Sequence, residues 1–177
     1  LQPIAVNASK KTVECFGKKA LPEKYVGQVV FENVSWNQLF QVIFTSGISA
    51  LNVQENRSVL KDKLGKRVAS ERISMVDDGT LTEGFGTSKI DDEGVPRQKT
   101  PIVEKGVLRN FLYDNYSAKR EKRESTGNAS RQRFYGAAAY ANQPTISPAN
   151  LTLVPDKGSL EDLVDETKEG VLVKGSL

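Results

Sequence analysis

The sequence predicts an α+β domain that is rich in β-structure and contains two or three helices. Two observations carry this prediction: a helical stripe of apolar residues over 36–51, and a strand–turn–strand pattern over 98–112. A third is composition, since 38% of the 177 residues are hydrophobic and 27% are charged, which suits one folded domain. The polar, weakly patterned residues 1–27 are expected to be a linker or entry segment, and residues 28–177 the domain.

The strongest helical signal begins after a short strand at residues 28–32. Asn33 or Ser35 can cap the start of this helix. Gly47 weakens its later part, so a break is expected near Ser46 and Gly47. The apolar positions repeat every three or four residues and are expected to face the core: Trp36, Leu39, Phe40, Ile43, Gly47 and Leu51.

The other elements follow from local signals. Lys105 and Gly106 separate two strand patterns and predict a two-residue hairpin turn. Ser159 and Asp162 form a capping-box arrangement at the start of a helix that Gly170 ends. Further elements are expected as a strand over 72–76, a helix over 113–124, a strand over 150–154 and a strand over 171–173.

The chain contains no histidine, which excludes several kinds of site within it. A Ser-His-Asp triad, a Cys-His nucleophile and a histidine-ligated zinc all need an imidazole. Cys15 is the single cysteine, so no internal disulfide can form. The net charge of +3 is too small to indicate a polyanionic partner. No apolar run reaches membrane-spanning length and the start lacks a signal-peptide layout, so a cytoplasmic protein is expected.

Two acidic groups and one polar loop are the candidates for chemistry. Asp77-Asp78 and Asp91-Asp92-Glu93 could offer oxygen ligands to a cation, but each precedes a glycine and is expected to form a turn. The loop of Ser125, Thr126, Gly127 and Asn128 could hydrogen-bond an extended peptide or a partner's backbone. A self-satisfied turn is the favoured alternative for this loop.

A basic stretch over 119–133 carries six Lys and Arg residues against two Glu residues. Such a stretch could bind phosphates. However, the charges interleave as they do on a solvated helix face, so nucleic acid is not expected as a partner.

Six sequence blocks, in order and spacing, resemble the C-terminal domain of the TldD/PmbA family, also called modulator of DNA gyrase. They are DDGT at 77–80, IDDEGVP at 90–96, IVEKGVL at 102–108, YSAK at 116–119, STGNASR at 125–131 and SLEDL at 159–163. The resemblance runs from about residue 28 to 175. It implies a cytoplasmic metallopeptidase built from two related subunits, of which the TldD type carries an HExxxH zinc motif and the PmbA or TldE type lacks it.

Counting back without gaps from Asp77 places the family's HExxxH motif on residues 41–46. Gln41 and Ser46 stand where the resemblance requires imidazoles, and Val42 stands where it requires the general-base glutamate. The chain is therefore similar to the PmbA/TldE type. No catalytic residue and no cofactor are expected in this chain, and zinc is expected only in a TldD-type partner.

The resemblance also implies partners. A TldD-like subunit or a second copy of the chain is expected, together with a peptide substrate and no membrane. The 125–128 loop is expected to contact substrate or partner. Because family members continue with further β-structure, the domain is expected to be truncated at its C-terminal end. The alternative is a regulatory interaction protein of the gyrase-modulator type without peptidase activity.

Overall fold

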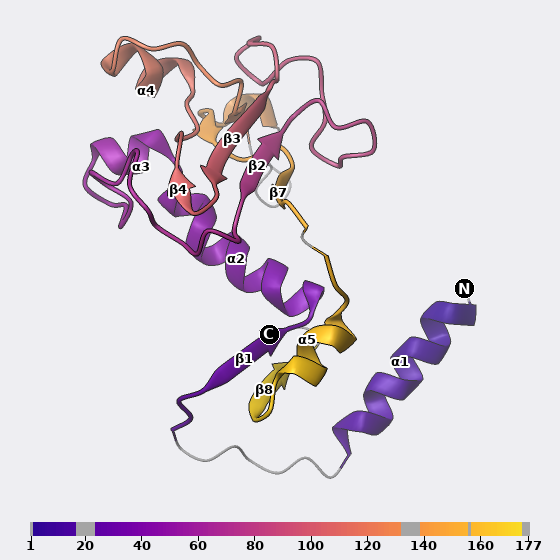
Figure 1. The fold of residues 1–177 in the computed structure, drawn as a ribbon. Coiled ribbons are helices and arrows are strands. Elements are labelled where there is room, and N and C mark those ends of the chain that lie inside the picture. Colours follow the sequence, from indigo (N-terminus) through magenta and orange to yellow (C-terminus); the bar gives the residue numbers. More distant parts are fainter. Residues whose placement is uncertain (1, 17–23, 132–138, 156, 175–177) are drawn as a thin grey trace.

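A computed structural model describes residues 2–16, 24–131, 139–155 and 157–174 of the chain (Figure 1). Its helices are α1 (Gln2–Cys15), α2 (Asn33–Gly47), α3 (Ala50–Gln54), α4 (Asn115–Arg120), α5 (Leu160–Glu166) and the short 3-10 helix η1 (Ala139–Ala141). Its strands are β1 (Gln28–Phe31), β2 (Met75–Asp78), β3 (Lys99–Glu104), β4 (Val107–Leu108), β5 (Ala129–Ser130), β6 (Thr145–Ile146), β7 (Leu151–Leu153) and β8 (Gly170–Val173).

The predicted α+β class is confirmed, but the described residues form five α-helices where two or three were expected. The additional ones are α1, which lies in the segment expected to be a linker, and the short α3. None of the described helices is both long enough and apolar enough to cross a membrane.

A four-stranded antiparallel sheet in the order β4-β3-β2-β7 forms the centre of the domain. In β2, Asp77 pairs with Thr100 of β3 on one side and with Leu151 of β7 on the other. Two smaller sheets accompany it, namely β1 with β8 in parallel and β5 with β6 in antiparallel order. The central position of β2 places Asp77 between segments that are far apart in the sequence.

The hydrophobic core lies between this sheet and helices α2, α3 and α4. Ile48, Ile102 and Leu112 are completely buried within it. Of the predicted helical stripe, Phe40 is buried and Trp36 packs against the core, but the Ile43 side chain is 56% exposed, so the prediction that Ile43 faces the core was wrong. Aromatic rings continue the core along α2, with Phe40 stacked on Phe44 at 4.7 Å and Trp36 at 5.6 Å from Phe40. Figure 1 shows α2 leading from β1 toward the four-stranded sheet.

The predicted break after Ser46 and Gly47 is confirmed, since α2 ends at Gly47 and α3 begins at Ala50. Tertiary hydrogen bonds use the backbone groups that the break leaves unpaired. The Ala50 N–H donates to the Leu112 carbonyl at 2.9 Å, and the Leu112 N–H donates to the Ile48 carbonyl at 2.9 Å. The start of α2 differs from expectation, because Asn33 and Ser35 lie inside the helix and Glu32 precedes it.

The hairpin and the C-terminal helix form where the sequence places them. Lys105 and Gly106 join β3 to β4 with φ angles of 45° and 77°, the pair of positive values that a two-residue hairpin favours. Ser159 and Asp162 make the predicted capping box at the start of α5. These features depend on neighbouring residues only, which is why local sequence predicts them.

Helix α4 is shorter than predicted, spanning Asn115–Arg120. Asp114 caps its start and makes a reciprocal capping box with Ser117. The chain then reverses at Lys122, whose φ is 54°, and the Arg123 N–H donates to the Ala118 carbonyl at 2.9 Å. This left-handed residue ends the helix before the predicted limit of residue 124.

Candidate functional site

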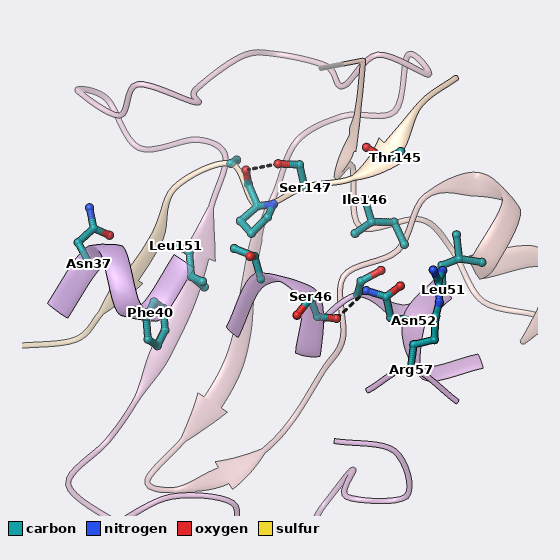
Figure 2. A pocket seen from close by; sticks show the side chains of 14 residues that line it. Asn37, Phe40, Ser46, Leu51, Asn52, Arg57, Thr145, Ile146, Ser147 and Leu151 are labelled. Carbon is teal, nitrogen blue, oxygen red and sulfur yellow. Dashed lines mark hydrogen bonds between the residues drawn. The ribbon is translucent and has the colours of Figure 1, made fainter. Parts of the chain in front are cut away.

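A cavity of about 690 Å³ lies between α2 and the segment of residues 145–151 (Figure 2). Thr45, Ser46 and Asn37 of α2 contribute to one wall, and Asn52 and Arg57 follow from the chain beyond it. The lining combines hydroxyl and amide groups with a few apolar side chains. Such a surface can hydrogen-bond the backbone of an extended peptide.

The opposite wall, residues 145–149, was not predicted from the sequence. These residues form β6 and the turn that leads to β7. Pro148 marks a turn, but no local pattern indicates which distant helix this turn faces. The wall exists only because α2 and residues 145–149, about a hundred positions apart, fold against one another.

Asn128 is hydrogen-bonded to the cavity wall of residues 145–149 from outside the cavity. Its Nδ2 lies 2.6 Å from Oδ2 of Asp77 and 3.2 Å from the carbonyl of Ser147, a cavity-lining residue. Asp77 also accepts a hydrogen bond of 2.9 Å from the Asn150 N–H through Oδ1. Strand β2, the 125–128 loop and the cavity wall are thus joined through two buried side chains, Asp77 and Asn128.

The polar groups of the 125–128 loop are used within the protein. The Ser125 hydroxyl donates to the Tyr113 carbonyl at 3.0 Å, and the Thr126 hydroxyl lies 2.7 Å from Oδ1 of Asn128. Gly127 has a φ of 71° and is buried. The loop therefore has the internally bonded form of a turn, and it reaches the cavity through Asn128 and Ser147 rather than by lining it. A contact between this loop and substrate or partner stays a prediction.

Asp77 and Asp78 lie in β2, and the turn predicted over residues 77–80 begins only at Gly79. The prediction was therefore wrong for the two aspartates and is confirmed for Gly79 and Thr80. Burial raises the pKa of Asp77, and this effect outweighs the hydrogen bonds from Asn128 and from the backbone of Ala149 and Asn150. The pKa of Asp78 is lowered, chiefly by the Thr80 hydroxyl at 2.7 Å. Partners on other segments allow carboxylates inside a strand, which a local turn rule does not take into account.

The second acidic group forms the predicted turn. Oδ1 of Asp91 accepts hydrogen bonds of 2.9 Å from the N–H groups of both Glu93 and Val95, and Gly94 has a φ of 80°. Oδ2 of Asp91 accepts a further bond of 3.0 Å from the Ala129 N–H. This carboxylate therefore fastens the turn to β5, the strand that follows the 125–128 loop.

A model of the PmbA/TldA metallopeptidase C-terminal domain matches residues 22–177. The chain belongs to this family. The resemblance drawn from the six sequence blocks is confirmed, and so is the mixed helix-and-sheet fold that it implied.

Relatives of this PmbA/TldD domain include archaeal and bacterial proteins. A metalloprotease of Methanocaldococcus jannaschii is 43% identical over 70% of this chain and 26% of its own length. The crystal structure of a candidate modulator of a DNA gyrase from Thermotoga maritima has a TM-score of 0.77 and 35% identity, over 93% of this chain and 35% of that one. TldE from Thermococcus kodakarensis has a TM-score of 0.74 and 31% identity, over 83% of this chain and 32% of that one. The chain thus spans about a third of the length of the relatives that it matches.

Residues 41–46, on which the gap-free count predicts the HExxxH motif of the PmbA/TldD family, lie on α2, and the end of this segment meets the cavity. Ser46 lines the cavity together with Thr45. Gln41 and Val42 belong to the same helix, but their side chains lie outside the described part of the structure.

The residues of this window do not fit a zinc ion. The ligand positions offer an amide and a hydroxyl, and the general-base position offers an alkyl group, whereas zinc sites in proteins use imidazole, thiolate and carboxylate ligands. Within the described ranges, no three His, Cys, Asp or Glu side chains gather in a way that could hold a metal. The α2 face of the cavity therefore offers neutral hydrogen-bonding groups, and the absence of zinc from this chain stays a prediction.

The backbone carbonyl of Tyr113 in the PmbA/TldD domain accepts hydrogen bonds from the 125–128 loop. The Tyr113 side chain gives a pH-dependent prediction. Its hydroxyl donates to Oε2 of Glu121 at 2.8 Å, and burial followed by this bond raises its pKa from 10.0 to about 12. The unfolded chain loses the phenolic proton first, so this contribution to stability is present below pH 10 and is lost as pH rises toward about 12. We expect Tyr113→Phe to show a smaller fall of the free energy of unfolding across that interval. Urea titrations at successive alkaline pH values test this, and parallel curves for the two proteins would contradict it.

The described part of the basic stretch makes contacts within the domain. The Arg120 guanidinium lies 5.7 Å from the centre of the Tyr116 ring, and that of Arg123 lies 5.7 Å from the Tyr113 ring. Arg123 also lies 3.7 Å from Glu121. Arg133 lies outside the described residues. Of the described part of this stretch, Lys119 and Arg120 lie in α4 and Lys122 lies in the turn that follows, so the expected helix face accounts for the beginning of the stretch alone. The absence of a nucleic-acid partner stays a prediction.

Proposed function

We propose that this chain is the C-terminal part of a zinc-free subunit in a TldD/TldE-type metallopeptidase. The observation that carries the proposal is which residues occupy the predicted motif positions on α2, together with the cavity that this helix borders. Its family motif positions carry Gln41, Val42 and Ser46, yet the helix still borders a polar cavity through Ser46 and Thr45. A subunit that no longer needs metal ligands can keep the cavity for peptide binding and leave the chemistry to a related subunit.

In this proposal the chain contributes to the peptide-binding cleft and to the interface between subunits. The hydroxyl and amide groups of Thr45, Ser46 and Asn52 offer hydrogen bonds to a peptide backbone, which makes binding tolerant of sequence. The partner is a TldD-like subunit in a cytoplasmic heterodimer, and it supplies the groups that activate water. The family relationship and the similarity to TldE support this assignment.

We expect the protein to raise the peptidase activity of a TldD-type partner from the same organism when the two are mixed. The protein alone is expected to be inactive on the same peptides and to contain no stoichiometric zinc, because its motif window lacks zinc ligands. Activity assays, size-exclusion chromatography and elemental analysis of each protein and of the mixture test these expectations. The partner alone, at equal concentration, is the control. Equal activity with and without this protein, combined with separate elution, would contradict the proposal.

The alternative is a regulatory interaction protein of the gyrase-modulator type without peptidase activity. The description of the Thermotoga maritima neighbour favours it, as does the basic stretch at 119–133. Filter binding of DNA across a range of salt concentrations separates the two. Binding that weakens steeply with salt would support the alternative, and no binding at low salt would reject a direct contact with DNA.

A further inference from the structure

Among the described residues that line the cavity, Arg57 is the one charged side chain. Its neighbours in the lining carry hydroxyl, amide or apolar groups. We propose that this cavity binds a carboxylate of an extended peptide, and that Arg57 determines this specificity. The inference rests on the proposed function, because it names the class of peptide that the same cavity takes.

The backbone at Arg57 is tied to the end of α2. Its N–H donates to the Asn52 carbonyl at 2.8 Å, and Nδ2 of Asn52 donates to the Ser46 carbonyl at 2.8 Å. Figure 2 shows Arg57 near Leu51 and Asn52, and these three residues line one end of the cavity. This connection keeps the cation close to Ser46, the last position of the family motif window.

The guanidinium is available to a ligand. Its Nη2 contacts Oε2 of Glu55, but the Arg57 side chain is 60% exposed and the Glu55 side chain 41% exposed. An exposed ion pair of this kind contributes about 0–1 kcal/mol, so a carboxylate from a peptide can compete with it. Arginine has five N–H donors in a planar fork, which allows a second carboxylate to be bound at the same time.

The rest of the cavity determines which charges are accepted. The lining has no acidic side chain, and the Glu55 carboxylate beside it is already paired with Arg57. A lysine or arginine of a peptide would therefore have to compete with Arg57 for Glu55 and would be repelled by the guanidinium. Hydroxyl groups of Ser46 and Ser147 offer neutral hydrogen bonds to the peptide backbone around the carboxylate. The carboxylate can come from an acidic side chain or from the C-terminus of the peptide, since both present the same group.

Fluorescence anisotropy with labelled peptides and the full chain tests the inference. One peptide sequence is made with Glu, Gln or Lys at one internal position, each with a free or an amidated C-terminus. The variants are Arg57→Gln, Arg57→Lys and Arg57→Glu. The matched control is Arg109→Gln, because Arg109 pairs with Glu104 at 3.0 Å in a similarly exposed surface ion pair away from this cavity.

We expect the protein to bind a carboxylate-bearing peptide about tenfold more tightly than its neutral counterpart, as charge-assisted hydrogen bonding suggests. Arg57→Gln should remove this preference, Arg57→Glu should reverse it toward the Lys peptide, and Arg109→Gln should preserve it. Loss of the preference on amidation alone identifies the C-terminus as the source, and loss on the Glu-to-Gln change alone identifies the side chain.

Two further outcomes separate this inference from the proposed function. If peptides bind and the TldD-type partner is activated, but Arg57→Gln leaves the charge preference unchanged, the inference is wrong and the proposed function stands. If no peptide binds and the partner is not activated, both are wrong.

Discussion

Replacing Asn128 by aspartate is expected to lower the free energy of unfolding at pH 7 by about 4 kcal/mol, because one carboxyl must hold its proton about three pH units above its unfolded pKa of about 3.9. In the wild-type protein, Nδ2 of Asn128 donates to Oδ2 of Asp77 at 2.6 Å, and both side chains are buried. Aspartate at position 128 would place a second carboxyl group against the first, and two such groups cannot both ionise.

The loss in the Asn128→Asp variant should depend on pH. One carboxyl of the pair keeps its proton in the folded state, so its folded pKa lies above the unfolded value of about 3.9. Stability is then retained below about pH 4 and lost as pH rises through the raised folded pKa. The wild-type Asp77, whose pKa burial already raises, contributes in the same direction.

Urea denaturation between pH 4 and pH 8 measures this effect. Asn128→Ala is the matched control, because it removes the bonds to Asp77 and Ser147 without adding a charge. It should be destabilised with a pH dependence in the same direction as Asn128→Asp but smaller, because losing this bond raises the pKa of Asp77 further without adding a second carboxyl. A parallel profile for Asn128→Asp would show that the two carboxyl groups do not interact as the geometry requires. Because the Ser147 wall depends on Asn128, both variants should also bind peptide less tightly.

Gly127→Ala is expected to be the most damaging of the small substitutions in the 125–128 loop. Gly127 has a φ of 71°, and a Cβ atom would lie 2.4 Å from the carbonyl oxygen of Pro96 and 3.1 Å from the Cα of Arg97. The left-handed conformation costs about 1–2 kcal/mol and overpacking about 1–3 kcal/mol, so a total loss of about 2–5 kcal/mol is expected.

Gly65 provides the control that separates these two causes. Its φ is 76°, but a Cβ atom there would have nothing within 4 Å. Gly65→Ala should therefore show the conformational cost alone, about 1–2 kcal/mol. Urea midpoints of the two variants measure the difference, and equal losses would mean that the backbone of Pro96 and Arg97 moves away at little cost.

The elements that sequence predicted well are those whose causes are local. The Lys105–Gly106 turn, the Ser159 capping box and the break at Gly47 depend on residues within one or two turns of each other. The motif window that the family resemblance predicts at residues 41–46 lies on a helix, and Ser46 lines the cavity. Gln41 and Val42 also lie on α2.

The fold class, the family and the absence of imidazole ligands can all be read from the amino-acid sequence, because composition, local pattern and motif order carry this information directly. The position of Asp77 in a strand and the support that Asn128 gives to a cavity wall come from the three-dimensional arrangement. The same holds for the cavity that Arg57 and Ser46 line together with residues 145–149. These features join residues that are far apart along the chain. The partner of Asp77 lies 51 positions away, so no local propensity can indicate that its buried carboxylate is compensated.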